Sequence, residues 1–345
     1  MKPDLWSLYQ YMLKSRLFEE AVAQLWNQGH ISGEMHLSVG EEAIAAGIVT
    51  QLQEGDAMAL DHRGTSPLLM RGVDPVLLLR EFLGRPDGLC AGKGGHMHLF
   101  SPAHLAASSG IVGASGPTAA GFALAAQYLR PQTLAVAFFG DGATNQGMLL
   151  EAMNLAAAWN LPLLFVCKDN GWAISTHSPS VSGGNLLDRA RGFGLRASEV
   201  DGSDVEAVWG VAREALERAR QGNGPTFLCA RCVHLEGHLL GDPLLGMTRH
   251  PLKEMRPRTI PMLRTVSKKK GAPVRERAAS LRAIASIAWA IRGQSSKQHD
   301  PVERTRQQLK ADGARLQKLE TETQREVERL VQVALLPAGQ GGDLS

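Results

Sequence analysis

Two uninterrupted apolar runs near the middle of the chain predict the framework of the fold. Residues 134–139 and 163–167 are apolar without alternation, which is typical of strands covered on both faces of a parallel sheet. Between the two runs, apolar residues recur at helical spacing, at Met148, Ala152, Leu155 and Trp159. The pattern predicts a strand–helix–strand unit. Because its strands are parallel, their carboxyl ends meet at one edge of the sheet, where ligands bind in open α/β folds.

Polar side chains stand where each of these strands ends. Asp141 closes the first strand and Asn170 follows the second. Two oxygen ligands at neighbouring strand ends are what a hard cation such as Mg²⁺ needs to hold a pyrophosphate. Gly140 and Gly142 flank the aspartate, so a phosphate can approach bare backbone, and Asn145 is the expected cap of the following helix.

Composition narrows the class of protein only slightly. The 37 basic residues exceed the 34 acidic ones by 3, so charge alone indicates no nucleic-acid partner. The sequence has no run of eighteen apolar residues, and we expect no membrane association. The opening MKPDLWSLYQ resembles neither a signal peptide nor an Arg-rich presequence, so we expect a cytoplasmic protein.

Cys229 and Cys232 form a CxxC pair inside the apolar run TFLCARCV. In a strand, residues three apart point to opposite faces, and no second pair stands at zinc-ribbon spacing. The pair is therefore expected to be buried and structural rather than a zinc or redox site.

The strand-end motifs resemble a known family. GDGATNQG followed by KDNGWAIST resembles the thiamine diphosphate motif of the α subunit in the first component of 2-oxoacid dehydrogenases, which include the pyruvate, branched-chain and acetoin enzymes. The resemblance runs from about Leu5 to Pro243 and resumes near Asp300. It implies an α/β thiamine diphosphate-binding fold, with a mostly parallel sheet, helices on both faces and a C-terminal helical extension.

The resemblance also assigns roles to particular residues. It implies that Mg²⁺ is held by the side chains of Asp141 and Asn170 and by the carbonyl of Trp172. It places His36 and His238 among the catalytic groups, although a histidine before a helix is otherwise often a capping or packing residue. The residues it implies for the thiamine diphosphate site are His62, Arg63, Gly110, Ile111, Val112, Gly140, Asp141, Gly142, Ala143, Asn170 and His234.

The chain departs from the family pattern at several points. Glu41 replaces the glutamine of H-x-x-x-G-Q-E-A, and Thr65 stands where a histidine usually follows Arg63. His234 replaces an arginine that helps to hold the diphosphate, which removes a permanent positive charge. The segment AGKGGHMH is not a P-loop, but it matches the family's GKGGSMH, where we single out His98.

Three functions are consistent with these features. The first is the α subunit of an enzyme that decarboxylates a 2-oxo acid, or cleaves acetoin, and passes the acyl unit to a lipoyl group on an acyltransferase. It implies an α₂β₂ heterotetramer with a separate β subunit. The second is a dinucleotide-dependent oxidoreductase, although the glycine at 147 is misplaced for G-x-G-x-x-G. The third is a cofactor-binding or regulatory subunit without turnover, suggested by Thr65 and His234.

The chain divides into three expected regions. Residues 1–245 form the thiamine diphosphate domain, in which Ser203 and Glu206 are expected to make a capping box for a helix that ends near Arg220. Residues 246–299 form a basic, partly disordered insertion, either a solvated loop or a contact for an acidic partner or nucleic acid. Residues 300–345 form terminal amphipathic helices and a tail.

Overall fold

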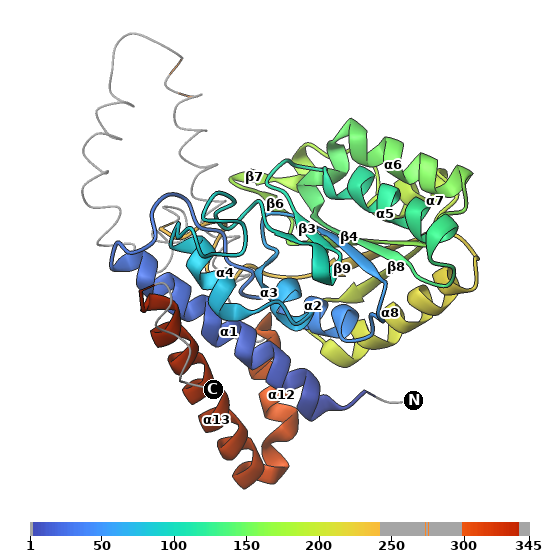
Figure 1. The fold of residues 1–345 in the computed structure, drawn as a ribbon. Helices are drawn as coiled ribbons and strands as arrows, with labels where there is room; N and C mark the ends of the chain where they lie inside the picture. Colours follow the sequence, from blue (N-terminus) through green and yellow to red (C-terminus); the bar gives the residue numbers. More distant parts are fainter. Residues whose placement is uncertain (1–2, 242–272, 274, 276–298, 338–345) are drawn as a thin grey trace.

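The computed structural model describes residues 3–241, 273, 275 and 299–337. Its centre is a seven-stranded sheet in the order β2-β3-β1-β4-β5-β9-β8 (Figure 1). The pairings of this sheet are parallel apart from that of β2 with β3. The strands are β1 (Ala57–Leu60), β2 (Phe100–Ser101), β3 (Ala106–Ser108), β4 (Ala135–Gly140), β5 (Leu163–Asp169), β8 (Arg196–Asp201) and β9 (Thr226–Arg231). The predicted mostly parallel sheet is confirmed.

The two apolar runs form the central strands β4 and β5. They pair in parallel with Phe139 opposite Cys167, and β5 runs two residues further than predicted, to Asp169. Asp141 and Asn170 therefore follow adjacent strand ends at the same edge of the sheet. A short hairpin of β6 (Trp172–Ala173) and β7 (Thr176–His177) lies beyond that edge.

Helices cover both faces of the sheet, as predicted (Figure 1). One face carries α5 (Ser115–Leu129), α6 (Gly147–Ala158) and α7 (Leu186–Gly192). The other face carries α1 (Leu5–Asn27), α2 (Glu42–Val49), α3 (Thr65–Met70), α4 (Pro75–Phe82) and α8 (Val205–Arg220). Each face has its own buried core. Cys229 belongs to one core and Cys232 to the other, so the prediction of a buried pair on opposite faces is confirmed.

Two predicted helix caps were wrong, although the helix predicted between the two central strands is present as α6. Asn145 does not cap α6, because residues 141–145 form a 3₁₀ turn and Gln146 precedes the helix. The cap of α8 is Asp204, whose carboxylate accepts the backbone N–H of Ala207 at 3.0 Å, rather than Ser203. On α6, Met148 and Trp159 are exposed, while Leu149 and Met153 face the core.

The C-terminal helices lie against the N-terminal helix. In Figure 1, α12 (Pro301–Leu309) and α13 (Gly313–Leu335) run beside α1. Arg16 of α1 bridges Glu42 at 2.6 Å and Asp300 at 3.0 Å. Most of the predicted insertion, 246–299, lies outside the described residues, so the domain boundaries stay predictions. No helix in the described part of the chain is both long and apolar enough to cross a membrane.

Candidate functional site

A cavity of about 470 Å³ opens at the carboxyl edge of the sheet. The fourteen residues predicted for the site all line it, from loops that lie up to about 200 residues apart in sequence. They are His36, His62, Arg63, Gly110, Ile111, Val112, Gly140, Asp141, Gly142, Ala143, Asn170, Trp172, His234 and His238. Lys168, Glu41, Asp61 and Gln146 also line it and were not predicted.

Asp141 stands at the end of this cavity where the metal ion is predicted to bind. Its side chain is buried, and one carboxylate oxygen accepts the hydroxyl hydrogen of Ser178. Burial raises the pKa of Asp141 to about 6, opposed by the Ser178 hydrogen bond and reinforced by the charge of Asp169. Burial makes the charged form of this carboxylate unfavourable, and a bound cation would stabilise that charged form. At Gly142, a Cβ atom would lie 2.8 Å from that of Ala173, so this part of the wall has no room for a side chain.

A buried ionic network runs along the wall beside Asn170. Nζ of Lys168 donates to Oε2 of Glu41 at 2.7 Å and to Oδ1 of Asp61 at 2.9 Å. Nε2 of His234 lies 2.8 Å from Oε1 of Glu41, and its Nδ1 lies 2.9 Å from the amide nitrogen of Asn170. Burial raises the pKa of Glu41, but the charge of Lys168, the hydrogen bond with His234 and the charge of Arg63 together outweigh burial, and the net pKa is lowered. Glu41 is therefore ionised at neutral pH.

Three histidines meet at the other end of the cavity. The ring centres of His36 and His62 are 4.7 Å apart, and those of His36 and His238 are 5.0 Å apart. Burial, followed by the charge of Arg63, lowers the pKa of His36 to about 2 and that of His238 to about 3. Burial likewise lowers the pKa of His62 to about 4. All three rings are neutral at pH 7.

His96, which was not singled out, contacts His36 directly. Its Nε2 lies 3.2 Å from the backbone N–H of His36 and 3.0 Å from Nδ1 of His36. Because a backbone N–H only donates, Nε2 of His96 carries no hydrogen, and Nδ1 of His36 must donate to it. Nε2 of His36 is then the unprotonated nitrogen. His98 is exposed and does not line the cavity, and a role for it at the site stays a prediction.

Two loops carry His36 and His238 into contact. The backbone N–H of Leu240 bonds to the carbonyl of Met35 at 2.9 Å. Gly40 has φ +104°, and a Cβ there would lie 1.9 Å from the carbonyl oxygen of Val233. The two loops therefore touch through backbone atoms at a place that only glycine fits.

The side chain of Arg63 hydrogen-bonds to both of these loops. Its guanidinium is 2% exposed and donates to the backbone carbonyls of Leu37 and His238, the latter at 2.6 Å. Its Nη2 also lies 3.4 Å from Nδ1 of His238. Binding of phosphate by Arg63 stays a prediction. Thr65 is buried in the first turn of α3 and does not line the cavity.

Comparison with known proteins agrees with this geometry. The family profile described as "Dehydrogenase E1 component" matches residues 9–276.

The chain belongs to the dehydrogenase E1 component family. It is similar to the α subunit of acetoin:2,6-dichlorophenolindophenol oxidoreductase from Cupriavidus necator, 42% identical over 243 residues, which cover 70% of this chain and 73% of that one. The Bacillus subtilis protein of the same name is 41% identical over 240 residues, with 69% and 72% covered. The pyruvate dehydrogenase E1 component subunit alpha of Zymomonas mobilis is 39% identical over 258 residues, with 74% and 73% covered.

Membership identifies the chain as an α-type E1 chain of a thiamine diphosphate-dependent enzyme. The residues of the cavity fit that cofactor. A buried carboxylate at a strand end suits the cation that accompanies a diphosphate. The side-chain-free wall at Gly142 suits a phosphate, and the exposed apolar side chains of Ile111 and Val112 suit an aromatic ring. Family membership favours thiamine diphosphate over a dinucleotide as the cofactor.

Proposed function

We propose that this chain is the α subunit of an α₂β₂ enzyme that decarboxylates a 2-oxo acid, or cleaves acetoin, and passes the acyl unit to a lipoyl group on an acyltransferase. The single observation that carries the proposal is the convergence of the predicted cofactor and metal residues on one cavity at the carboxyl edge of the sheet. The site is thus assembled from loops that are far apart in the sequence.

In this proposal Asp141, Asn170 and the carbonyl of Trp172 hold Mg²⁺, and the backbone around Gly142 receives the diphosphate. Oxygen ligands of this mixed kind are what Mg²⁺ prefers. His234 lacks the permanent positive charge of the family's arginine. Lys168 provides a positive charge nearby, because its Nζ belongs to the same buried network and lines the cavity. Bound thiamine diphosphate supplies the electron sink for cleaving the bond next to a carbonyl.

The two catalytic histidines have complementary hydrogen-bonding roles. Nε2 of His36 is unprotonated and accepts a proton or hydrogen bond. Nδ1 of His238 faces the guanidinium donor of Arg63, so its Nε2 carries the hydrogen and donates. Both rings are neutral at pH 7, which suits them to proton transfer with the substrate rather than to binding its carboxylate.

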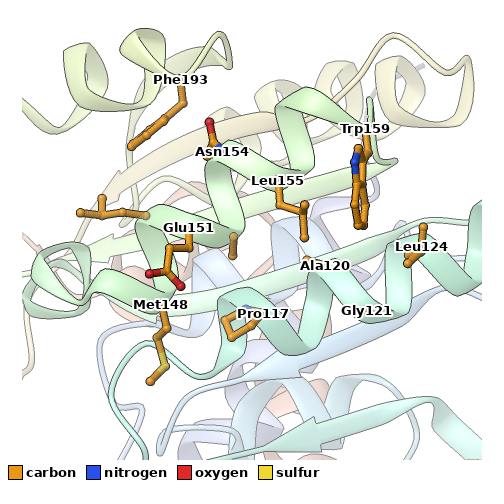
Figure 2. Close-up of a pocket in the computed structure, with 12 residues that line it drawn as sticks. Pro117, Ala120, Gly121, Leu124, Met148, Glu151, Asn154, Leu155, Trp159 and Phe193 are labelled. Carbon is orange, nitrogen blue, oxygen red and sulfur yellow. The ribbon is translucent and has the colours of Figure 1, made fainter.

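The surface around the cavity supports a β-type partner. Ile111, Val112 and Ile174 are exposed at its rim. An apolar groove of about 700 Å³ runs between α5 and α6, and Figure 2 shows Leu124, Leu155 and Trp159 along it.

The groove and the cavity adjoin each other at Gly113 and Met148. A Cβ on Gly113, which lines the cavity, would lie 3.4 Å from Met148, which lines the groove. We infer that one partner chain covers both surfaces and completes the cofactor site. Apolar patches of this kind mark interaction surfaces on soluble proteins.

Calorimetry with thiamine diphosphate and Mg²⁺ tests the proposal on the chain purified with its β-type partner. We expect saturable binding that requires both components, and turnover of pyruvate or acetoin followed by reduction of 2,6-dichlorophenolindophenol. The substrate that is turned over decides between the two substrate classes. Cofactor binding without any turnover would instead favour a regulatory subunit, and failure to bind would contradict the proposal. Location in the cytoplasm stays a prediction.

A further inference from the structure

Asn170 is held at both ends of its amide. Its Oδ1 accepts the backbone N–H of Trp172 at 3.2 Å, and its Nδ2 lies 2.9 Å from Nδ1 of His234. A backbone N–H can only donate, so the oxygen of the amide lies on the side of Trp172 and the nitrogen faces His234. The orientation of Asn170 follows from its partners.

The partner of His234 fixes which of its nitrogens accepts. Nε2 lies 2.8 Å from Oε1 of Glu41, and a carboxylate can only accept. Nε2 therefore carries the hydrogen, and Nδ1 is free of hydrogen and receives the amide of Asn170. Lys168 holds the other oxygen of Glu41 at 2.7 Å, so the carboxylate cannot turn away.

Glu41 and His234 are both departures from the family pattern, and they bond to each other. An arginine at position 234 has no acceptor atom and could not receive the amide of Asn170. A glutamine at position 41 can present either oxygen or nitrogen and would leave the tautomer of the imidazole open. Together, Glu41 fixes the tautomer of His234, and His234 supplies the acceptor for the amide of Asn170.

We propose that Glu41 and His234 are positioning residues that hold Asn170 with its amide oxygen directed to the magnesium site. Partners of a ligand that orient it toward a metal commonly change metal affinity by tenfold or more when removed. The inference rests on the proposed function, because it requires Mg²⁺ at Asp141 and Asn170.

The test measures metal affinity rather than turnover. With the chain purified together with its β-type partner and saturated with thiamine diphosphate, free Mn²⁺ is titrated by electron paramagnetic resonance. We expect His234→Phe to weaken Mn²⁺ binding on the order of tenfold and Glu41→Gln to weaken it a few fold. His30→Phe, which places the same new ring on an exposed position, should leave the affinity unchanged. Circular dichroism melting checks that each variant is folded.

The same substitution made in an Asn170→Asp variant separates loss of the amide orientation from a general disturbance of the site. In the Asn170→Asp background the two carboxylate oxygens are equivalent, so no amide needs orienting. His234→Phe should then change Mn²⁺ affinity less than twofold. An equal loss in both backgrounds, or unchanged affinity in folded Glu41→Gln, would overturn the inference. If the unmodified complex binds no Mn²⁺ with the cofactor, the proposed function fails instead.

Discussion

Nε2 of His96 accepts a hydrogen bond from Nδ1 of His36 at 3.0 Å, and this bond determines which nitrogen of His36 faces the cavity. The family motif GKGGSMH has a serine at this position, whereas this chain has the imidazole of His96. The interaction joins the loop before α2 to the loop before β2.

The first prediction follows from that bond. Replacing His96 by alanine removes the acceptor, so His36 is free to adopt either tautomer. We expect kcat to fall on the order of tenfold, with little change in the affinity for thiamine diphosphate. Dye-coupled kinetics and calorimetry measure the two quantities. His98→Ala, two residues away and exposed, is the control, and an equal loss there would contradict the assignment.

The second prediction concerns the contact between the two histidine loops. Gly40→Ala combines φ +104° with a Cβ 1.9 Å from a carbonyl oxygen, so the loops must separate. We expect a loss of more than about 3 kcal/mol in the free energy of unfolding, together with weaker cofactor binding. Gly29→Ala has φ +81° but nothing within 4 Å. It should cost only about 1 kcal/mol, from backbone strain alone. Similar losses in the two variants, measured by urea unfolding, would argue against a steric cause.

The third prediction concerns the dependence of stability on pH. Burial raises the pKa of Glu19 to about 7, and the hydrogen bond from Ser38 at 2.6 Å opposes the rise only in part. The carboxyl group of Glu19 therefore binds its proton more tightly in the folded state than in the unfolded state. The resulting stability is present below about pH 4.5 and is lost as the pH rises through about 7.

Glu19→Gln stays neutral at every pH and keeps an oxygen for Ser38. We expect the variant to be more stable than the unmodified chain at pH 8, on the order of 3 kcal/mol, and nearly equal to it at pH 4.5. Thermal melts at both pH values measure the difference. Glu206→Gln, at an exposed position of α8, should show no such dependence, and a pH-independent effect of Glu19→Gln would refute the explanation.

The fourth prediction concerns the partner surface. Trp159 is 50% exposed at one end of the groove in Figure 2. Trp159→Arg places a charge against the inferred partner, and we expect association with the β-type chain to weaken at least tenfold while the melting temperature of the free chain is kept. Tyr11→Arg, on α1 at the other face of the sheet, is the matched control. Sedimentation of the mixed chains measures both, and unimpaired assembly of Trp159→Arg would remove the groove from the interface.

Much of the site was predictable because its signals are local. Two apolar runs, each followed by an oxygen-bearing residue, predict strand ends at one sheet edge, and Asp141 and Asn170 lie there. The strand period likewise predicts that Cys229 and Cys232 enter different cores. In each case the signal lies within one short stretch of sequence.

Contacts between distant loops were not predictable from one sequence. Nothing local distinguishes His96 from His98, because the choice depends on where residues 35–40 lie. Glu41 and His234 each depart from the family pattern, which the sequence shows. Their hydrogen bond was not predictable, because it joins residues 193 positions apart. The prediction of the α8 cap was wrong because neighbouring polar residues can each occupy the cap position. In the structure Asp204, and not Ser203, occupies it.

The packing of α1 against α12 and α13 has a consequence for how the chain is made. The hydroxyl of Tyr9 bonds to Glu320 at 2.8 Å, so an early-synthesised helix finds its partner 311 residues later. During translation the central sheet can assemble first, since all of its strands are synthesised before α12 and α13. The part of the α1 surface that α12 and α13 cover therefore stays exposed until those two helices have been synthesised.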